Sequence, residues 1–332
     1  MSSLALSYGG LLYLDRTLPL YLDQVRPAGI DLTYVPFDSP GDLFRRQCQY
    51  AQFEVSELSA SSYLAMLSRG DDRFVALPLP VSRNFRHSQV YVHTDAGIAR
   101  PEDLRGRRVG ILEYQMTAAL WIRGFLADDH GVTPDQVDWH TGGLVEPAWA
   151  ERLELDLPEG VRLTPIPAGA TLEAMLEAGE LDALVTVQPP QRFGQVPQLR
   201  RLFEDATAVE RDYHRRTGIF PIMHLVVVRR DVYERHRWVA LALYEAFARA
   251  KAQGMGRLRA ITGLAVGLPF LAAALAEVDE AFAGDAFPYG VEPNRLTLQK
   301  LSDYAFEQGI AARRVPVEEM FAPETYQEPI AL

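Results

Sequence analysis

Short apolar runs alternate with stretches of helical periodicity along this chain, and no other feature constrains its fold as much. A short apolar run bounded by turn residues predicts a buried strand, whereas apolar residues three and four positions apart predict a helix. The predicted strands cover residues 4–8, 32–35, 53–57, 74–79, 90–93, 108–111, 161–165, 183–187 and 223–229. The predicted helices cover residues 41–49, 61–68, 117–130, 172–178 and 237–253, with more helix from residue 260 onward. This alternation is typical of an α/β protein.

The length, charge and cysteine content of the chain limit the classes of protein to which it can belong. At 332 residues the chain is long enough for two domains, because single hydrophobic cores stop growing at about 250 to 300 residues. The net charge of -11 argues against nucleic acid, since phosphate affinity comes from clustered Lys and Arg. The first ten residues lack the pattern of a signal peptide and no segment gives an uninterrupted membrane span, so we expect a cytoplasmic protein with no membrane partner. Cys48 is the only cysteine, which excludes disulfides within one chain, and we expect it to be buried or inert.

Two passages resemble type 2 periplasmic-binding-protein folds. Residues 98–109 contain Pro-Glu-Asp-Leu-Arg-Gly before a Val-Gly strand, and residues 172–184 resemble a helix and strand found later in the same lobe. The resemblance implies a two-lobed α/β fold with a ligand cleft between the lobes. The first lobe would be discontinuous and comprise residues 1–93 and 217–332, and the second would comprise residues 94–216.

In such folds ligands bind beyond the carboxyl ends of the strands and between domains. We therefore expect the loops after the predicted strands to face a shared cleft: residues 8–10, 57–59, 82–87 and 113–117.

The loop at residues 82–87 (Ser-Arg-Asn-Phe-Arg-His) carries the first candidate site. Arg83 and Arg86 supply two guanidinium groups, which bind carboxylates bidentately, and His87 can transfer protons near neutral pH. The alternative is an exposed loop whose arginines pair with surface acids. Its position at a strand end favours a site for a dicarboxylate, or for a carboxylate plus a phenolate.

Two further candidates lie in other predicted strands or directly after them. Glu57, two residues before Ser59, would stay ionised beside guanidinium groups and serve as a base or orient a histidine. Its alternative role is to cap the helix that begins near residue 61. His224 lies in an apolar strand, where a lone histidine is often a core residue. Because that strand is expected to return to the first lobe, its side chain can also line the cleft, and His224 becomes the second proton-transfer candidate.

Tyr114 and Thr117 precede a predicted helix whose free backbone N–H groups can receive an anion, unless Thr117 is only an N-cap. Arg123 in that helix can reach the cleft or the solvent. The seven histidines show no metal-ligand spacing, so we expect no metal and no other cofactor, although a divalent ion held by both histidine candidates and an acid stays open. Nucleotide-binding and serine-hydrolase motifs are missing from the sequence.

Longer strings resemble the 4,5-dihydroxyphthalate decarboxylase family along nearly the whole chain. The matching strings are Asp15-Arg16-Thr17, Phe44-Arg45-Arg46, Glu57-Leu58-Ser59, Ser82-Arg83 with Phe85-Arg86-His87, Tyr114 with Met116-Thr117-Ala118, Trp121 and Arg123-Gly124, Thr217-Gly218-Ile219-Phe220-Pro221-Ile222-Met223-His224, and Pro288-Tyr289-Gly290-Val291 with Asn294-Arg295. Two positions depart from the family pattern: Phe287 stands where we expect Trp, and Trp149 where a Gly-Arg step is usual.

The resemblance implies non-oxidative decarboxylation of a hydroxylated aromatic acid, most directly of 4,5-dihydroxyphthalate to protocatechuate (3,4-dihydroxybenzoate) and carbon dioxide in phthalate catabolism. Such an enzyme needs one acid, one base and carboxylate anchors, because the ring carbon must be protonated before carbon dioxide leaves. Arg83 and Arg86 would bind carboxylate or phenolate, and His87 or His224 would protonate the ring. Glu57 would orient a histidine or accept the phenolic proton, and Arg16, Thr117, Tyr114, Arg123 and Ser59 would contribute further substrate contacts.

Two other functions stay open from the sequence. The fold alone suits a non-catalytic solute-binding protein for an aromatic or other small anion. A biosynthetic enzyme of the same fold acting on a related substrate is the second alternative. Homo-oligomer formation also stays open.

Overall fold

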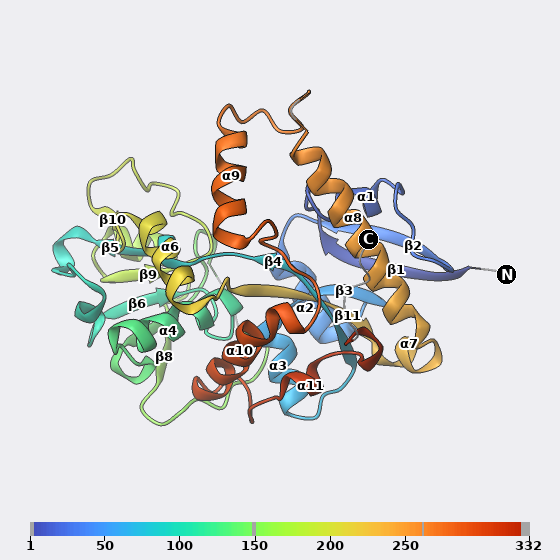
Figure 1. The fold of residues 1–332 in the computed structure, drawn as a ribbon. Helices are drawn as coiled ribbons and strands as arrows, with labels where there is room; N and C mark the ends of the chain where they lie inside the picture. Colours follow the sequence, from blue (N-terminus) through green and yellow to red (C-terminus); the bar gives the residue numbers. More distant parts are fainter. Residues whose placement is uncertain (1–2, 148–150, 261, 327–332) are drawn as a thin grey trace. The chain divides into compact units, whose positions relative to one another are not determined.

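A computed structural model describes residues 3–147, 151–260 and 262–326 of the chain (Figure 1). Contacts divide it into two units. Unit 1 holds the described residues of 1–83, 222–299 and 315–332, and unit 2 holds those of 84–221 and 300–314. Each unit contains a β-sheet with helices, so the predicted α/β class is confirmed. Within the described ranges, no helix is long and apolar enough to cross a membrane.

The sheet of unit 1 has the strand order β2-β1-β3-β11-β4. Strand β1 (Leu4–Leu11) is parallel to β2 (Ile30–Phe37) and to β3 (Val55–Ser59). Strand β11 (Ile222–Arg229) runs antiparallel to β3 and to β4 (Phe74–Arg83). The carboxyl ends of β1, β3 and β4 therefore meet the start of β11 at one edge of this sheet.

Helices cover both faces of that sheet. The long helix α8 (Trp238–Leu258) buries Leu243 and Phe247 in one core cluster with Tyr8 and Leu77 of the strands. Gly9, next to Tyr8, faces the other way, where an added Cβ would lie 2.9 Å from Leu43 of α2 (Pro40–Tyr50). Only glycine fits this close approach. The other helices of unit 1 are α1 (Leu18–Tyr21), α3 (Ala60–Ser68), α7 (Arg230–Arg235), α9 (Leu271–Phe282) and α11 (Val317–Met320).

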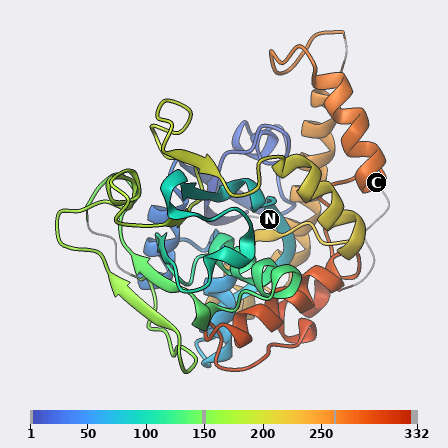
Figure 2. The same ribbon diagram turned by 90° about the vertical axis from the view of Figure 1, so that its left-hand side faces the viewer.

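The sheet of unit 2 has the order β10-β5-β9-β6-β7-β8. These strands are β5 (Val90–His93), β6 (Arg108–Ile111), β7 (Asp138–Thr141), β8 (Arg162–Pro165), β9 (Ala183–Val185) and β10 (Leu199–Arg201). Strand β6 is parallel to β7 and β9, whereas β5 is antiparallel to β9 and β10. The helices of this unit include α4 (Thr117–His130), α5 (Leu172–Glu177) and α6 (Ala206–Thr217), and residues 84–221 run from teal through green to yellow in Figure 2.

Helix α4 is buried along most of its length and packs closely against α10 (Arg295–Glu307), whose last part belongs to unit 2. A Cβ added at Gly124 would lie 2.2 Å from the Tyr304 ring, so the two helices can approach only over a glycine. The helix ends at Gly131, which adopts the left-handed conformation typical of a C-cap. Short 3-10 turns connect the elements: η1 (His87–Gln89), η2 (Thr94–Ala96), η3 (Pro101–Leu104), η4 (Pro134–Gln136), η5 (Glu292–Asn294) and η6 (Pro323–Thr325).

The observed units differ from the expected lobe boundaries. Residues 84–93 belong to unit 2 rather than to the first lobe, because β5 pairs with β9 and β10 of the second sheet. Residues 217–221 also lie in unit 2, and so do residues 300–314, which pack against α4. No hydrophobic pattern predicted β7, β10 or α6. Helix α6 buries only Ala206 and Tyr213, so it lacks the apolar stripe from which a helix is predicted.

Candidate functional site

Glu57 and His224 form the centre of the candidate site, at the edge of the unit 1 sheet. Strand register places His224 of β11 between Ser59 of β3 and Ser82 of β4. The Nδ1 atom of His224 lies 2.6 Å from Oε1 of Glu57, whose side chain is fully buried. The histidine side chain keeps 15% of its surface exposed, and the ring of Phe44 packs edge-on against it. Because Nδ1 faces the carboxylate, Nε2 is the ring nitrogen that can meet a ligand.

Three hydrogen bonds fix the Glu57 carboxylate. The hydroxyl of Tyr13 donates to the same Oε1 atom at 2.6 Å, and the backbone N–H of Leu11 donates to Oε2 at 2.9 Å. Tyr13 is held in turn by Thr17, whose hydroxyl accepts its backbone N–H at 2.9 Å. Glu57 therefore lies where it can orient the histidine, which is one of its predicted roles. It does not cap α3, which begins at Ala60 after Ser59.

Burial and the charge of Glu57 keep the neighbouring phenols protonated. Burial, followed by Glu57, raises the pKa of Tyr13 well above its ordinary value. Burial likewise raises the pKa of Tyr8, Tyr34 and Tyr289, and the carboxylate adds to each shift. At neutral pH these hydroxyls can donate hydrogen bonds but cannot act as bases.

Two predicted arginines belong to the same region of unit 1. Arg83 ends β4, is only 8% exposed and donates to the amide oxygen of Asn294. The amide nitrogen of Asn294 is tied to the carbonyl oxygens of Pro288 at 2.8 Å and Gly290 at 2.7 Å. Burial lowers the pKa of the Arg83 guanidinium to about 9, against the smaller opposing effect of Asp285 and Tyr289, so the group is still charged at pH 7.

Arg16 lies between two aromatic rings. Its guanidinium carbon is 4.4 Å from the centre of the Tyr13 ring and 4.0 Å from that of Phe287, and Nη1 pairs with Asp15 at 2.7 Å. Phe287, which stands where the family pattern leads us to expect Trp, stacks on this arginine. Glu57, Ser59, His224, Arg83 and Arg16 are therefore the predicted residues that unit 1 brings together.

His87 lies in unit 2, in an aromatic cluster. It is 2% exposed, stacks on Phe125 with ring centres 3.9 Å apart, and meets Phe203 and Tyr213. Burial lowers the pKa of His87 to about 4, so the ring is neutral at pH 7. Arg86 is half-buried just before it.

The remaining predicted residues belong to the interior of unit 2. Arg123 is buried rather than exposed to solvent: its guanidinium carbon lies 3.6 Å from the centre of the Tyr114 ring, Nη2 donates to the Tyr114 carbonyl and Nε donates to Gln308 at 2.8 Å. Burial lowers the pKa of Arg123 and raises that of Tyr114. Thr117 is buried as the first residue of α4, and Met116 occupies the N-cap instead.

Several polar contacts in the two units, each described separately, were not found from the sequence. Tyr13 has no signal beyond a position two residues after β1. In unit 2, Glu113 and Arg152 form a buried ion pair with 2.5 Å between Nη2 and Oε2, and Glu151 accepts the backbone N–H groups of Tyr114 and Gln115. Burial, with a contribution from Glu113, raises the pKa of Glu151 to about 7. The neighbouring Trp149, where the sequence departs from the family pattern, lies outside the described residues.

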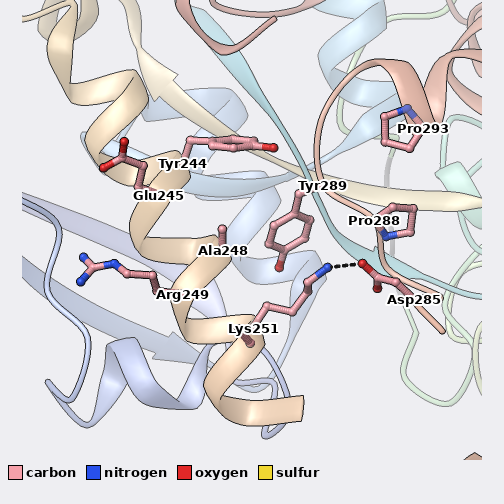
Figure 3. Close-up of a pocket in the computed structure, with 10 residues that line it drawn as sticks. Tyr244, Glu245, Ala248, Arg249, Lys251, Asp285, Pro288, Tyr289 and Pro293 are labelled. Atoms are coloured by element: carbon pink, nitrogen blue, oxygen red, sulfur yellow. Dashed lines mark hydrogen bonds and ion pairs between the residues drawn. The ribbon is translucent and has the colours of Figure 1, made fainter. Parts of the chain in front are cut away.

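A separate groove of about 540 Å³ lies between α8 and residues 285–293 of unit 1 (Figure 3). Tyr244, Ala248 and Tyr289 supply apolar surface, and none of the predicted site residues is among its described lining. Lys251 pairs with Asp285 at 2.6 Å and donates to the Phe287 carbonyl at 2.8 Å, which ties residues 285–287 to α8. In the described part of the chain, no three His, Cys, Asp or Glu residues are grouped so that they could hold a metal ion.

Comparison with curated proteins finds relatives that carry one name. The chain is 36% identical over 328 residues to 4,5-dihydroxyphthalate decarboxylase of Comamonas testosteroni, covering 98% of this chain and 99% of the relative. It is 37% identical over 201 residues to 4,5-dihydroxyphthalate decarboxylase of Pseudomonas putida, covering 60% of this chain and 78% of the relative. No protein-family model matches the chain.

Solved structures show the fold. The chain resembles the periplasmic aliphatic sulphonate binding protein SsuA of Escherichia coli, with a TM-score of 0.53 and 13% identity over 98% of this chain and 100% of that one. A putative sulfonate-binding SsuA of Methylobacillus flagellatus gives a TM-score of 0.55 at 14% identity, over 98% of this chain and 93% of that one. A DSZB mutant in complex with biphenyl-2-sulfinic acid gives 0.53 at 17%, over 97% of each chain. The predicted periplasmic-binding-protein-like fold is confirmed.

Proposed function

Because the chain belongs to the 4,5-dihydroxyphthalate decarboxylase family, we propose that it converts 4,5-dihydroxyphthalate to protocatechuate and carbon dioxide. It is accordingly a carboxy-lyase. The Glu57–His224 pair at the edge of the unit 1 sheet is the observation that carries the assignment of residues. It supplies a histidine of fixed orientation on the strand that pairs with β4, which ends at the buried Arg83.

The arginines suit the charges of this substrate. Arg83 is already desolvated, so a carboxylate that pairs with it meets a guanidinium that has little water to lose. Arg16 is held over two rings by cation–π contacts, and its charge favours the phenolate form of a substrate hydroxyl. We assign a carboxylate to Arg83 and a phenolate oxygen to Arg16.

The proton chemistry then needs one acid. The substrate reacts as the phenolate of the hydroxyl para to the departing carboxylate. The imidazolium of His224 gives its Nε2 proton to the ring carbon that bears this carboxylate, which forms a C–H bond and a non-aromatic ketone. The bond to the carboxylate breaks next, carbon dioxide leaves, and the electron pair restores the aromatic ring and the phenolate. Neutral His224 regains a proton from water.

This scheme chooses between the two histidines left open by the sequence. A proton donor at pH 7 must carry a proton to give, and burial holds His87 neutral inside its aromatic cluster. His224 keeps part of its ring accessible and has a carboxylate to pair with its charge. We assign His87 a structural role in unit 2. Substrate contacts from Arg86, Tyr114, Thr117 and Arg123 of unit 2, and from Ser59 of unit 1, stay predictions.

The family relationship does not favour a non-catalytic solute-binding protein. The absence of nucleic-acid and membrane partners, the cytoplasmic location, homo-oligomer formation and independence from metals are also predictions still to be measured.

Incubation of the purified protein with 4,5-dihydroxyphthalate tests the function. We expect protocatechuate and carbon dioxide in equal amounts. Phthalate is the matched control, because it keeps both carboxylates but has no hydroxyl to supply electrons, and it should bind without turnover. Binding of 4,5-dihydroxyphthalate without any product would instead support a solute-binding protein. A product other than protocatechuate would point to a different enzyme of this fold.

A further inference from the structure

Oxygen Oε1 of Glu57 accepts two hydrogen bonds of equal length. His224 Nδ1 and the Tyr13 hydroxyl each lie 2.6 Å from it. A carboxylate oxygen has two lone pairs and can accept both, but each donor draws on the same negative charge. The two donors therefore compete for the charge that fixes the imidazole.

Tyr13 is held in place for this contact by groups on several sides. Thr17 accepts its backbone N–H, and the Arg16 guanidinium lies over its ring. The hydroxyl of Ser82, on the strand paired with His224, hydrogen-bonds to the phenol of Tyr13. The segment of β1 with its following loop and strand β11 thus contact one carboxylate of β3, and β4 is connected to it through Tyr13.

We propose that Tyr13 is a positioning residue that makes His224 a better acid by sharing Oε1 of Glu57 with it. The inference rests on the proposed decarboxylase function. With part of its charge engaged by Tyr13, the carboxylate holds the imidazolium less firmly, and His224 releases its Nε2 proton to the ring carbon more readily.

Other groups near Glu57 do not replace Tyr13 in this role. Tyr8, Tyr34 and Tyr289 surround the carboxylate from β1, β2 and residues 285–293, and burial raises the pKa of each. They stay neutral at the working pH. Arg16 is the cation on the Tyr13 side, and it pairs with Asp15. Tyr13 itself stays protonated, because burial and Glu57 raise its pKa, so it acts as a donor and not as a base.

The test replaces Tyr13 and follows kcat against pH with 4,5-dihydroxyphthalate. In Tyr13→Phe the Glu57 carboxylate no longer accepts a hydrogen bond from a phenol, so its negative charge interacts more strongly with His224. The imidazolium therefore persists to higher pH but gives up its proton more slowly. We expect kcat at pH 7 to fall roughly 5- to 10-fold and its high-pH decline to move upward by up to about one pH unit, as the loss of one hydrogen bond implies. KM should stay within about twofold, because Tyr13 is not assigned a substrate contact.

Tyr34→Phe is the matched control. Tyr34 is another partly buried phenol near Glu57, but its hydroxyl donates to the Leu11 carbonyl at 2.6 Å and lies 3.1 Å from the Thr17 hydroxyl, instead of donating to the carboxylate. This variant should leave the position of the high-pH decline unchanged. A decline in Tyr13→Phe that coincides with that of wild type, or a rise in KM with kcat unchanged, would overturn the proposal.

A second variant covers the case in which Tyr13→Phe does not fold. Replacing Tyr13 with 3-fluorotyrosine keeps the hydroxyl and makes it a stronger donor, so the decline should move to lower pH. An unmoved or upward-moving decline would also refute the proposal. Absence of any decarboxylation by the wild-type protein would instead refute the function on which the proposal rests, so the two failures are distinguishable.

Discussion

Acid should destabilise unit 2 through His87. The ring is 2% exposed and stacked on Phe125, and burial lowers its pKa to about 4, with Asp129 opposing and His130 and Arg216 adding to the shift. In the unfolded chain a histidine titrates near 6.5. A group whose pKa is lower in the folded state contributes stability that is fully present above pH 6.5 and is lost as the pH falls towards 4.

The magnitude follows from the difference of about 2.5 pKa units. At about 1.36 kcal/mol for each unit, protonation of His87 can cost up to about 3.4 kcal/mol, of which about 2 kcal/mol is reached at pH 5. Urea unfolding at pH 7 and pH 5 measures this loss of unfolding free energy. The probe is the fluorescence of Trp121 and Trp139, both buried in unit 2. Between these pH values, wild type should lose about 2 kcal/mol more than His87→Phe, which keeps an aromatic ring but cannot titrate. An equal loss in both proteins would refute the reasoning.

Three further outcomes are expected. Arg83→Lys should raise KM for 4,5-dihydroxyphthalate roughly 10- to 100-fold in steady-state kinetics, because a lysine cannot bind a carboxylate bidentately, and an unchanged KM would contradict the carboxylate assignment. Gly124→Ala should lower the free energy of unfolding by about 1 to 3 kcal/mol in a urea titration, since its methyl group meets Tyr304, and an unaltered midpoint would count against that contact. Treatment with EDTA should leave the turnover rate unchanged, because the proposed scheme gives every proton and charge to a side chain. A loss of activity that a divalent ion restores would reopen the metal alternative.

Much of the fold could be predicted from the sequence, because its strands and helices carry strong hydrophobic patterns. Strand β11 is an apolar run, and α4 is apolar on most of its faces. Polar elements could not be predicted, because β10 has the sequence Leu-Arg-Arg and α6 has no apolar stripe. The unit to which β5 belongs depends on its pairing with β9, which no local pattern encodes.

The candidate site, like the fold, could be predicted from the sequence only in part. Glu57 and His224 could be placed at one edge of the sheet because each belongs to a strand that ends or begins at its carboxyl edge. The contact of Tyr13 with Glu57 could not be predicted, because this hydrogen bond joins residues 44 positions apart in sequence. The sequence also ranked His87 with His224, since both are flanked by apolar residues or follow an apolar strand. Only the packing of Phe125, Phe203 and Tyr213 around His87 separates a core histidine from an accessible one.

The central claim is that His224, oriented by Glu57, protonates the ring of 4,5-dihydroxyphthalate. The most direct test is the turnover of two variants side by side, His224→Gln and His87→Phe, at pH 7 with saturating substrate. Loss of a general acid should lower kcat of His224→Gln by about 100- to 10,000-fold, whereas His87→Phe should stay within a few-fold of wild type. Near wild-type turnover in His224→Gln, or the larger loss in a folded His87→Phe, would contradict the account.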